Sequence, residues 1–311
     1  MPSKKSSVAL GILYLLGAAL GFAAMNLFVN LAGDLPTMQK VFFRNLITVF
    51  VVFALLLFQK EKFRIRKGCL KWLLLRSVVG FLGVVLNFYA IDHIGSISDA
   101  SILNKLSPFF AILFSVVLLK EKPGWLEIGF VVLAFAGAAL IVRPTFDASV
   151  LPALAGLLSG ACAGFAYTCV RILGVKGERG FMTVFFFSAF STLVALPFFI
   201  AGFTPMSFLQ VVYLLLAGVS ATVGQFFITA AYRCAPAKEI AVFDYSQVVF
   251  AALLGFFFLS QIPDAWSIAG YIVIIGAAVG RWLMNLRAER KRAEKVEKED
   301  FMNEKKRESG G

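Results

Sequence analysis

The 311-residue chain is too apolar for a water-soluble globule, because 59% of its residues are hydrophobic and only 15% are charged. A soluble domain carries about 25% charged residues, and apolar runs of about 18 or more residues indicate membrane spans. The formal net charge of +12 lies in short segments between the apolar runs and in the tail. The composition therefore predicts an integral membrane protein, and the charge calls for no nucleic-acid partner.

In chain order, the apolar runs predict ten transmembrane helices. They lie near residues 8–32, 37–58, 70–91, 98–119, 125–143, 150–173, 180–202, 207–232, 238–260 and 265–286. Turn-forming segments such as Gly33-Asp34-Leu35-Pro36 and Lys122-Pro123-Gly124 separate them. We expect an all-α membrane fold whose loops are too short to hold a soluble domain.

The chain contains the same apolar unit twice. Residues 17–23 (GAALGFA) return as residues 160–166 (GACAGFA), each inside a long apolar run. A second block also repeats without a gap, with Ala90, Phe110, Ala111, Leu113, Leu119 and Pro123 matching Ala230, Phe250, Ala251, Leu253, Leu259 and Pro263. We therefore predict two five-helix copies, residues 1–147 and 148–286, followed by a charged cytoplasmic tail at 287–311. An odd number of spans per copy gives inverted repeats, which are common in transporters.

The positions of the basic residues support this topology. With the amino terminus in the cytoplasm, Lys40 and Arg143 are the basic residues outside. The inner segments hold Lys4, Lys5, Lys60, Lys62, Arg64, Arg66, Lys67, Lys71, Lys120, Lys122, Arg171, Lys176, Arg179, Arg233 and Lys238. Cytoplasmic loops are enriched in Lys and Arg. Both termini should therefore be cytoplasmic in a multi-pass protein of the cell (inner or plasma) membrane. The tail is expected to extend the last helix and then to fray into disorder.

Pairs of glycines four residues apart let neighbouring helix backbones approach closely where lipid gives no hydrophobic drive. Such pairs occur at Gly17 and Gly21, Gly160 and Gly164, and Gly276 and Gly280. Their recurrence in both copies favours a moving helix interface, and a static packing surface is the alternative.

Several of these features together resemble the EamA family of the drug/metabolite transporter superfamily. They are the paired layout, Phe43-Arg44 early in the second span, and Pro108-Phe109-Phe110-Ala111 followed by Leu119-Lys120-Glu121. The resemblance covers essentially the whole chain. It implies a polytopic carrier that moves small metabolites by alternating access, often outward. Val248 and Gln261 stand where copy one has Pro108 and Glu121, so the ninth span should lack the proline kink of the fourth.

Few polar side chains lie at membrane depth, where a charge costs about 3 kcal/mol or more and is rarely kept without a use. The candidates for substrate binding are Arg44, Tyr89, Asn104, Lys105, Asp244, Tyr245 and Gln247. At the offset of the repeat, Asn104-Lys105 overlays Asp244-Tyr245. We expect Lys105 and Asp244 to face one cavity, where Lys105 and Arg44 hold a carboxylate or phosphate. Asp244 would then bind an amine or carry a proton, while a mutual ion pair that locks the bundle is the alternative.

The remaining polar residues have simpler interpretations. Arg76 is close enough to the inner surface to snorkel, and Asp99 and Glu239 are expected to cap helix starts. Lower-ranked candidates for the cavity or an interface are Tyr14, Asn26, Trp72, Asn87, Tyr167 and Gln225.

No motif for an enzyme, an ATP site, a metal or a cofactor is present, and His93 is the only histidine. We predict a secondary carrier that exports a small polar metabolite, an amino acid or another carboxylate-bearing molecule, by proton coupling or exchange. A flippase for a lipid or lipid-linked headgroup is the alternative, and a channel fits less well. The expected partners are this substrate and membrane lipids, and a monomer is favoured.

Overall fold

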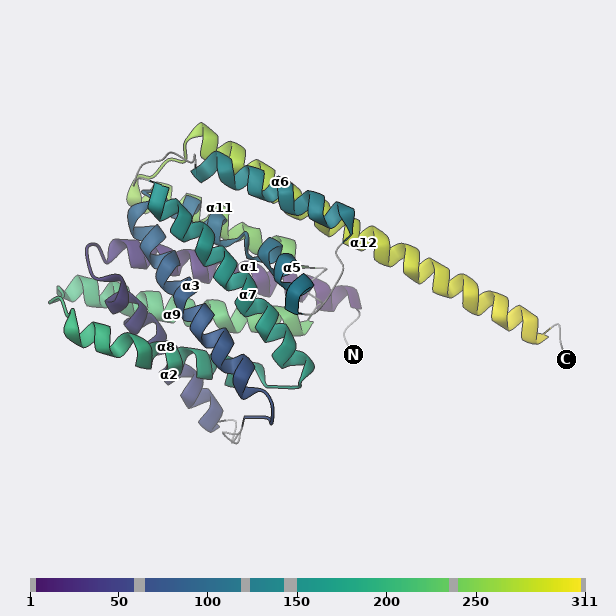
Figure 1. The fold of residues 1–311 in the computed structure, drawn as a ribbon, viewed down its shortest axis with the longest axis horizontal. Coiled ribbons are helices and arrows are strands. Elements are labelled where there is room, and N and C mark those ends of the chain that lie inside the picture. The colour runs from purple at the N-terminus through teal and green to yellow at the C-terminus, as the bar shows by residue number, and fades with distance from the viewer. Residues whose placement is uncertain (1–3, 59–64, 119–123, 143–149, 235–239, 309–311) are drawn as a thin grey trace.

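The computed structural model describes residues 4–58, 65–118, 124–142, 150–234 and 240–308, which form helices without any strand in those ranges (Figure 1). In chain order the helices are α1 (Lys4–Leu31), α2 (Thr37–Phe58), α3 (Leu70–His93), α4 (Ile97–Asn104), α5 (Ser107–Leu118), α6 (Trp125–Val142), α7 (Leu151–Val175), α8 (Gly180–Ala201), α9 (Phe208–Cys234), the 3₁₀ helix η2 (Ala241–Tyr245), α11 (Ser246–Leu259) and α12 (Ala265–Glu308). The all-α prediction is confirmed for this part of the chain.

Within the described residues, 8 helical stretches are long and apolar enough to cross a membrane. They are Val8–Leu31, Thr37–Leu55, Leu70–His93, Leu151–Val175, Gly180–Ala201, Phe208–Ile228, Val242–Leu259 and Ala265–Ala288. Trp125–Ile141 is a shorter apolar helix, and the fourth expected span is divided into α4 and α5. The chain is therefore a multi-pass membrane protein, while the count of ten and the orientation of the termini stay predictions.

Helices of the first half pack mainly against helices of the second half. The extensive contacts join α1 with α9, α3 with α7, α2 with α8, and α6 with α12. The pattern is reciprocal, because α1 also packs on α11 as α7 packs on α5. Figure 1 shows α6 and α12 side by side along one edge of the bundle. The two halves thus interlock, and neither forms a separate body.

Glycines permit the closest of these contacts. A Cβ atom added to Gly21 of α1 would lie 3.0 Å from the backbone nitrogen of Gly224 on α9. On α7, a Cβ at Gly160 would lie 2.6 Å from the carbonyl oxygen of Leu103. Such distances leave no room for a side chain without movement of the neighbouring backbone. These positions are packing surfaces, as their spacing predicts.

The third predicted glycine pair behaves differently. A Cβ at Gly280 would lie 2.8 Å from the ring of Phe130, but one at Gly276 would meet nothing within 4 Å. Gly270 and Gly137 make the close approach between α12 and α6 instead, since a Cβ at Gly270 would lie 2.7 Å from the oxygen of Gly137. The expectation for Gly276 is wrong because that residue lies on the exposed side of α12.

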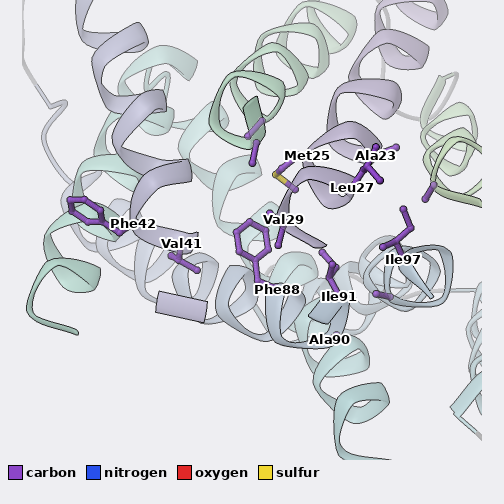
Figure 2. Close-up of a cluster of buried hydrophobic side chains, with 14 of the residues drawn as sticks. Ala23, Met25, Leu27, Val29, Val41, Phe42, Phe88, Ala90, Ile91 and Ile97 are labelled. Atoms are coloured by element: carbon purple, nitrogen blue, oxygen red, sulfur yellow. The ribbon is translucent and has the colours of Figure 1, made fainter. Parts of the chain in front are cut away.

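A large buried apolar cluster joins helices of both halves, because its members lie on α1, α2, α3 and α4 and also on α8, α9 and α11. Its members come from separate turns, and Figure 2 shows their side chains gathered around Phe88. Those labelled are Ala23, Met25, Leu27, Val29, Val41, Phe42, Phe88, Ala90, Ile91 and Ile97. This cluster fixes α1, α2 and α3 relative to one another and so sets the positions of the polar residues that follow.

The last helix continues well past the bundle. α12 runs to Glu308, and its carboxyl-terminal part extends away from the other helices in Figure 1. The expected helical extension of the last span is therefore confirmed, whereas the expected fraying does not occur up to Glu308. Its sequence alternates basic and acidic residues after Arg287, which suits a helix in water.

Candidate functional site

The fourth span is interrupted at membrane depth. α4 ends at Asn104 and α5 begins at Ser107, so Lys105 and Leu106 lie between two helices. Pro108 is the second residue of α5, where the missing backbone N–H costs no helical hydrogen bond. The break places Lys105 directly after the end of α4, and its side chain points towards the centre of the bundle.

The corresponding span of the second half is also irregular, although it lacks the proline. It starts as the 3₁₀ turn Ala241–Tyr245 and continues directly as α11 from Ser246. The hydroxyl of Ser246 donates to the carbonyl oxygen of Phe243 at 2.6 Å, which stabilises the tight turn. The ninth span thus lacks the proline, but its start is still not a regular α-helix. In copy two the irregular part is a tight 3₁₀ turn at the start of the span. In copy one it is the two non-helical residues, Lys105 and Leu106, between α4 and α5.

These two irregular segments bring Lys105 and Asp244 together. The Nζ atom of Lys105 lies 2.5 Å from the Oδ2 atom of Asp244, and both side chains are largely buried. Of the two arrangements that the sequence allows, the structure therefore has the mutual ion pair. The Oδ1 atom of Asp244 has no hydrogen-bond partner among the described residues.

Lys105 also lines a central cavity of about 150 Å³. Helices from both halves supply the wall, whereas α6 and α12 supply none of it. The polar lining residues are Asn26, Arg44, Arg76, Asn87, Asn104, Lys105, Tyr167, Gln225 and Gln247, and apolar ones include Phe22, Met25, Phe88, Phe187 and Ile228. A concave site with a few convergent polar groups on an apolar wall is the usual form of a small-molecule site.

Four of the seven candidates for substrate binding lie on this wall, namely Arg44, Asn104, Lys105 and Gln247, and so do the lower-ranked candidates Asn26, Asn87, Tyr167 and Gln225. Asn104 also donates to the hydroxyl of Ser159 at 3.0 Å, which ties α4 to α7. Asp244 reaches the cavity only through Lys105.

The two expected tyrosines lie elsewhere. Tyr89 stacks on His93 with ring centroids 4.2 Å apart, one turn along the same helix. Tyr245 is buried in an apolar cluster with Ile102 and Val248. A position next to a polar residue in sequence does not place a side chain on the same helix face, which is why both expectations differ from the structure.

Arg76 is the main wall residue that the sequence interpretation assigned to another role. Its guanidinium lies 3.6 Å from the ring centroid of Phe187 on α8, so it points into the bundle and does not snorkel to the surface. The sequence pattern that could have indicated this role is the spacing of polar and small residues on α3. Arg76, Gly80, Gly83 and Asn87 lie on one helix face, and all of them line the cavity. The small glycines keep that face open.

Hydrogen bonds from the cavity wall hold its position. The amide nitrogen of Asn26 donates to the hydroxyl of Ser101 at 3.0 Å, which joins α1 to α4. The Oδ1 atoms of Asn26 and Asn87 accept no hydrogen bond within the described residues. Two amide oxygens of the wall are thus left for other donors.

Away from the cavity, one end of the bundle is closely tied together. Gln39 donates to the carbonyl oxygen of Thr204 at 3.0 Å and accepts from its backbone nitrogen at 3.1 Å. Lys40, which is 1% exposed, forms an ion pair with Asp92 at 2.7 Å. These contacts link the starts or ends of helices from both halves.

Asp99 lies in the first turn of α4, at a helix start as expected, but the capping residue is Ser96. The hydroxyl of Ser96 accepts from the backbone nitrogen of Asp99 at 3.3 Å. The Asp99 carboxylate accepts a short hydrogen bond from the Tyr271 hydroxyl on α12. The expected counterpart, Glu239, lies outside the described residues.

Comparison with known proteins identifies the family of this chain. The model of the EamA-like transporter family matches residues 9–143 and again residues 150–281, so the two matches cover nearly all of the bundle. The chain belongs to the EamA-like transporter family. The resemblance drawn from the sequence motifs is thereby confirmed.

Relatives of this EamA-like protein are transporters and not enzymes, which confirms that expectation. The chain is 37% identical over 278 residues to the Pseudopaline exporter CntI of Pseudomonas aeruginosa, covering 88% of this chain and 95% of that protein. It is 29% identical to human Solute carrier family 35 member G1, covering 88% of this chain and 80% of that one. This protein is therefore a membrane transporter.

A solved crystal structure shares the fold of this EamA-like protein. It superposes with a TM-score of 0.64 at 17% sequence identity, covering 88% of this chain and 98% of that one. At this identity the similarity concerns the fold alone.

Proposed function

We propose that this EamA-like protein is a secondary carrier that exports a small carboxylate-bearing metabolite, such as an amino acid or its derivative. The observation that carries the proposal is the cationic cavity, whose wall includes Arg44, Arg76 and Lys105. Cationic groups inside a membrane are costly unless they meet an anion. The name of the CntI relative, an exporter, supports the outward direction.

Alternating access is supported by the position of the cavity along the helices. On α3 the wall runs from Arg76, about two turns from the start of the helix, to Asn87, about two turns from its end, so the cavity lies midway along the helix. The end of the bundle that is predicted to be outside is tied by the Gln39–Thr204 and Lys40–Asp92 contacts. A midway cavity with a tied outer end fits a carrier that is loaded from the cytoplasm.

In this proposal the repeat supplies the mechanism. Residues 1–147 and 148–286 act as two inverted five-helix copies, residues 287–311 form a cytoplasmic tail, and the carrier lies in the cell membrane as a monomer among lipids. A substrate carboxylate would compete with Asp244 for Lys105. A proton or an exchanged solute would then balance the charge on Asp244.

Proteoliposomes that contain the full-length protein test the proposal by counterflow. Unlabelled carboxylate inside the vesicles should drive accumulation of the same labelled compound for at least one of glutamate, aspartate, succinate and citrate. Lys105→Gln should reduce this accumulation at least tenfold. Lys71→Gln, on the exposed face of α3, is the matched control and should not change it.

Absence of accumulation with all four compounds would contradict the carboxylate carrier. The flippase alternative would replace it if, in addition, the same vesicles moved a fluorescent phospholipid between leaflets.

A further inference from the structure

Two arginines of the cavity wall share one aromatic ring. Arg44 of α2 and Arg76 of α3 both face the ring of Phe187 on α8, with guanidinium carbons 5.9 Å and 3.6 Å from its centroid. Gly80 makes room for this group, because a Cβ there would lie 3.2 Å from Nη1 of Arg76 and 3.0 Å from the Phe187 ring. The ring and the glycine orient two cations towards the same space.

Neither guanidinium has a carboxylate partner in the part of the chain that the structure describes. Nη1 of Arg44 donates to the side-chain oxygen of Asn45 at 3.1 Å, but its Nε has no acceptor. Nε and Nη1 of Arg76 also have none. Arg44 is only 6% exposed, so water does not replace the missing partners over most of its surface.

Contact with an aromatic face offsets little of the cost of burying a guanidinium. Such contacts contribute about 0.5–2 kcal/mol, whereas an unpaired buried charge costs several kcal/mol. Lys105 is already neutralised by Asp244. The uncompensated charge of the cavity is therefore the two positive charges of Arg44 and Arg76, which a ligand with two negative charges would balance.

Arginine matches carboxylates geometrically, because its planar fork donates two parallel hydrogen bonds to the two oxygens of one carboxylate. We propose that Arg44 and Arg76, oriented by Phe187, form a double anion subsite that selects substrates with two carboxylates over those with one. This inference rests on the proposed function. It assigns the substrate class to dicarboxylates.

The test compares acids of nearly equal size that differ in one charge. Succinate and glutarate each carry two carboxylates, and succinamate and glutaramate carry one carboxylate and one neutral amide. Titration calorimetry on the purified full-length protein in detergent should give at least tenfold tighter binding for each dicarboxylate than for its monoamide. Arg76→Gln and Arg44→Gln should each remove this preference, because they weaken binding of the dicarboxylate and leave the affinity for the monoamide unchanged.

Three matched measurements make the result decisive. Arg287→Gln removes an exposed arginine of α12 that lies outside the cavity and should keep the full preference. Phe187→Leu leaves both charges but removes the shared ring, so it should reduce the preference only in part. Inorganic phosphate should bind more weakly than succinate, and tighter binding of phosphate would overturn the dicarboxylate assignment.

Equal affinity of the wild-type protein for a dicarboxylate and its monoamide would overturn the inference, and this comparison needs no variant to fold. An equal loss of affinity for the dicarboxylate and for its monoamide in the arginine variants would overturn the inference too. In these two cases carboxylates still bind, so the proposed function stands. If none of the four acids binds and no counterflow occurs, both the double anion subsite and the proposed carboxylate carrier are contradicted.

Discussion

At the scale of single residues, Asp244 has an unusual set of contacts for a carboxylate in a membrane. One oxygen accepts from Lys105 at 2.5 Å, and the other has no partner among the described residues. Lys105 in turn faces the cavity. Any anion that binds Lys105 therefore changes the charge balance of Asp244, which makes this residue the candidate for proton coupling.

The Asp244→Asn variant tests that role. An imposed pH gradient should change the rate of carboxylate transport in wild-type proteoliposomes, and the variant should lose this dependence because an amide takes up no proton. Loss of the pair should also lower stability by about 3–5 kcal/mol, since Lys105 is left buried without an anion. Transport in a pH gradient and thermal unfolding in detergent measure the two effects.

The matched control is Asp264→Asn, at an exposed position before α12. There the carboxylate of Asp264 caps the helix by accepting from the backbone nitrogen of Ser267 at 2.8 Å. Asparagine caps helices as well as aspartate does. The control should therefore keep both pH dependence and stability. A pH dependence that survives in Asp244→Asn would assign proton coupling to another residue or leave exchange as the mechanism.

At the scale of elements, α7 packs on the break between α4 and α5 through its glycines. A Cβ at Gly164 would lie 2.5 Å from the carbonyl oxygen of Ser107 and 2.9 Å from the backbone nitrogen of Ala111. Backbone atoms cannot turn away as a side chain can. The small residues of α7 are therefore required by the shape of the interrupted span, which in turn positions Lys105.

Gly164→Ala should consequently destabilise the protein by about 1–3 kcal/mol, the usual cost of overpacking. Gly174→Ala on the same helix is the control, since a Cβ there would meet nothing within 4 Å. Alanine favours the helix, so this control should be neutral or slightly stabilising. Thermal unfolding of both variants in one detergent compares them, and equal melting temperatures would contradict the close contact.

At the scale of the whole molecule, the two halves interlock through reciprocal helix pairs. α1 packs on α9 as α7 packs on α3, and α2 packs on α8. The five spans that we predict for each half would make the two copies enter the membrane from opposite sides. The equivalent segments before α2 and before α8 should then lie on opposite sides of the membrane.

Labelling of single cysteines checks this topology. In a protein whose 4 native cysteines are replaced by serine, Asp34→Cys, before α2, should react with an impermeant maleimide in intact cells. Lys176→Cys should react only after the membrane is permeabilised. Both residues are exposed, so accessibility to the reagent and not burial decides the result. Reaction of Lys176→Cys in intact cells would reverse the proposed orientation.

The sequence by itself determined the membrane class, the duplication, the family and most helix positions, because composition and apolar run length depend on local residues alone. It also placed Arg44, Asn104, Lys105 and Gln247 at depth, and all four line the cavity. Only the tertiary structure decided that Lys105 pairs with Asp244, and that Arg76 turns towards Phe187 while Tyr89 and Tyr245 lie elsewhere. The physical reason is that depth follows from position along a span, whereas the direction of a side chain depends on which helix of the other half packs against it.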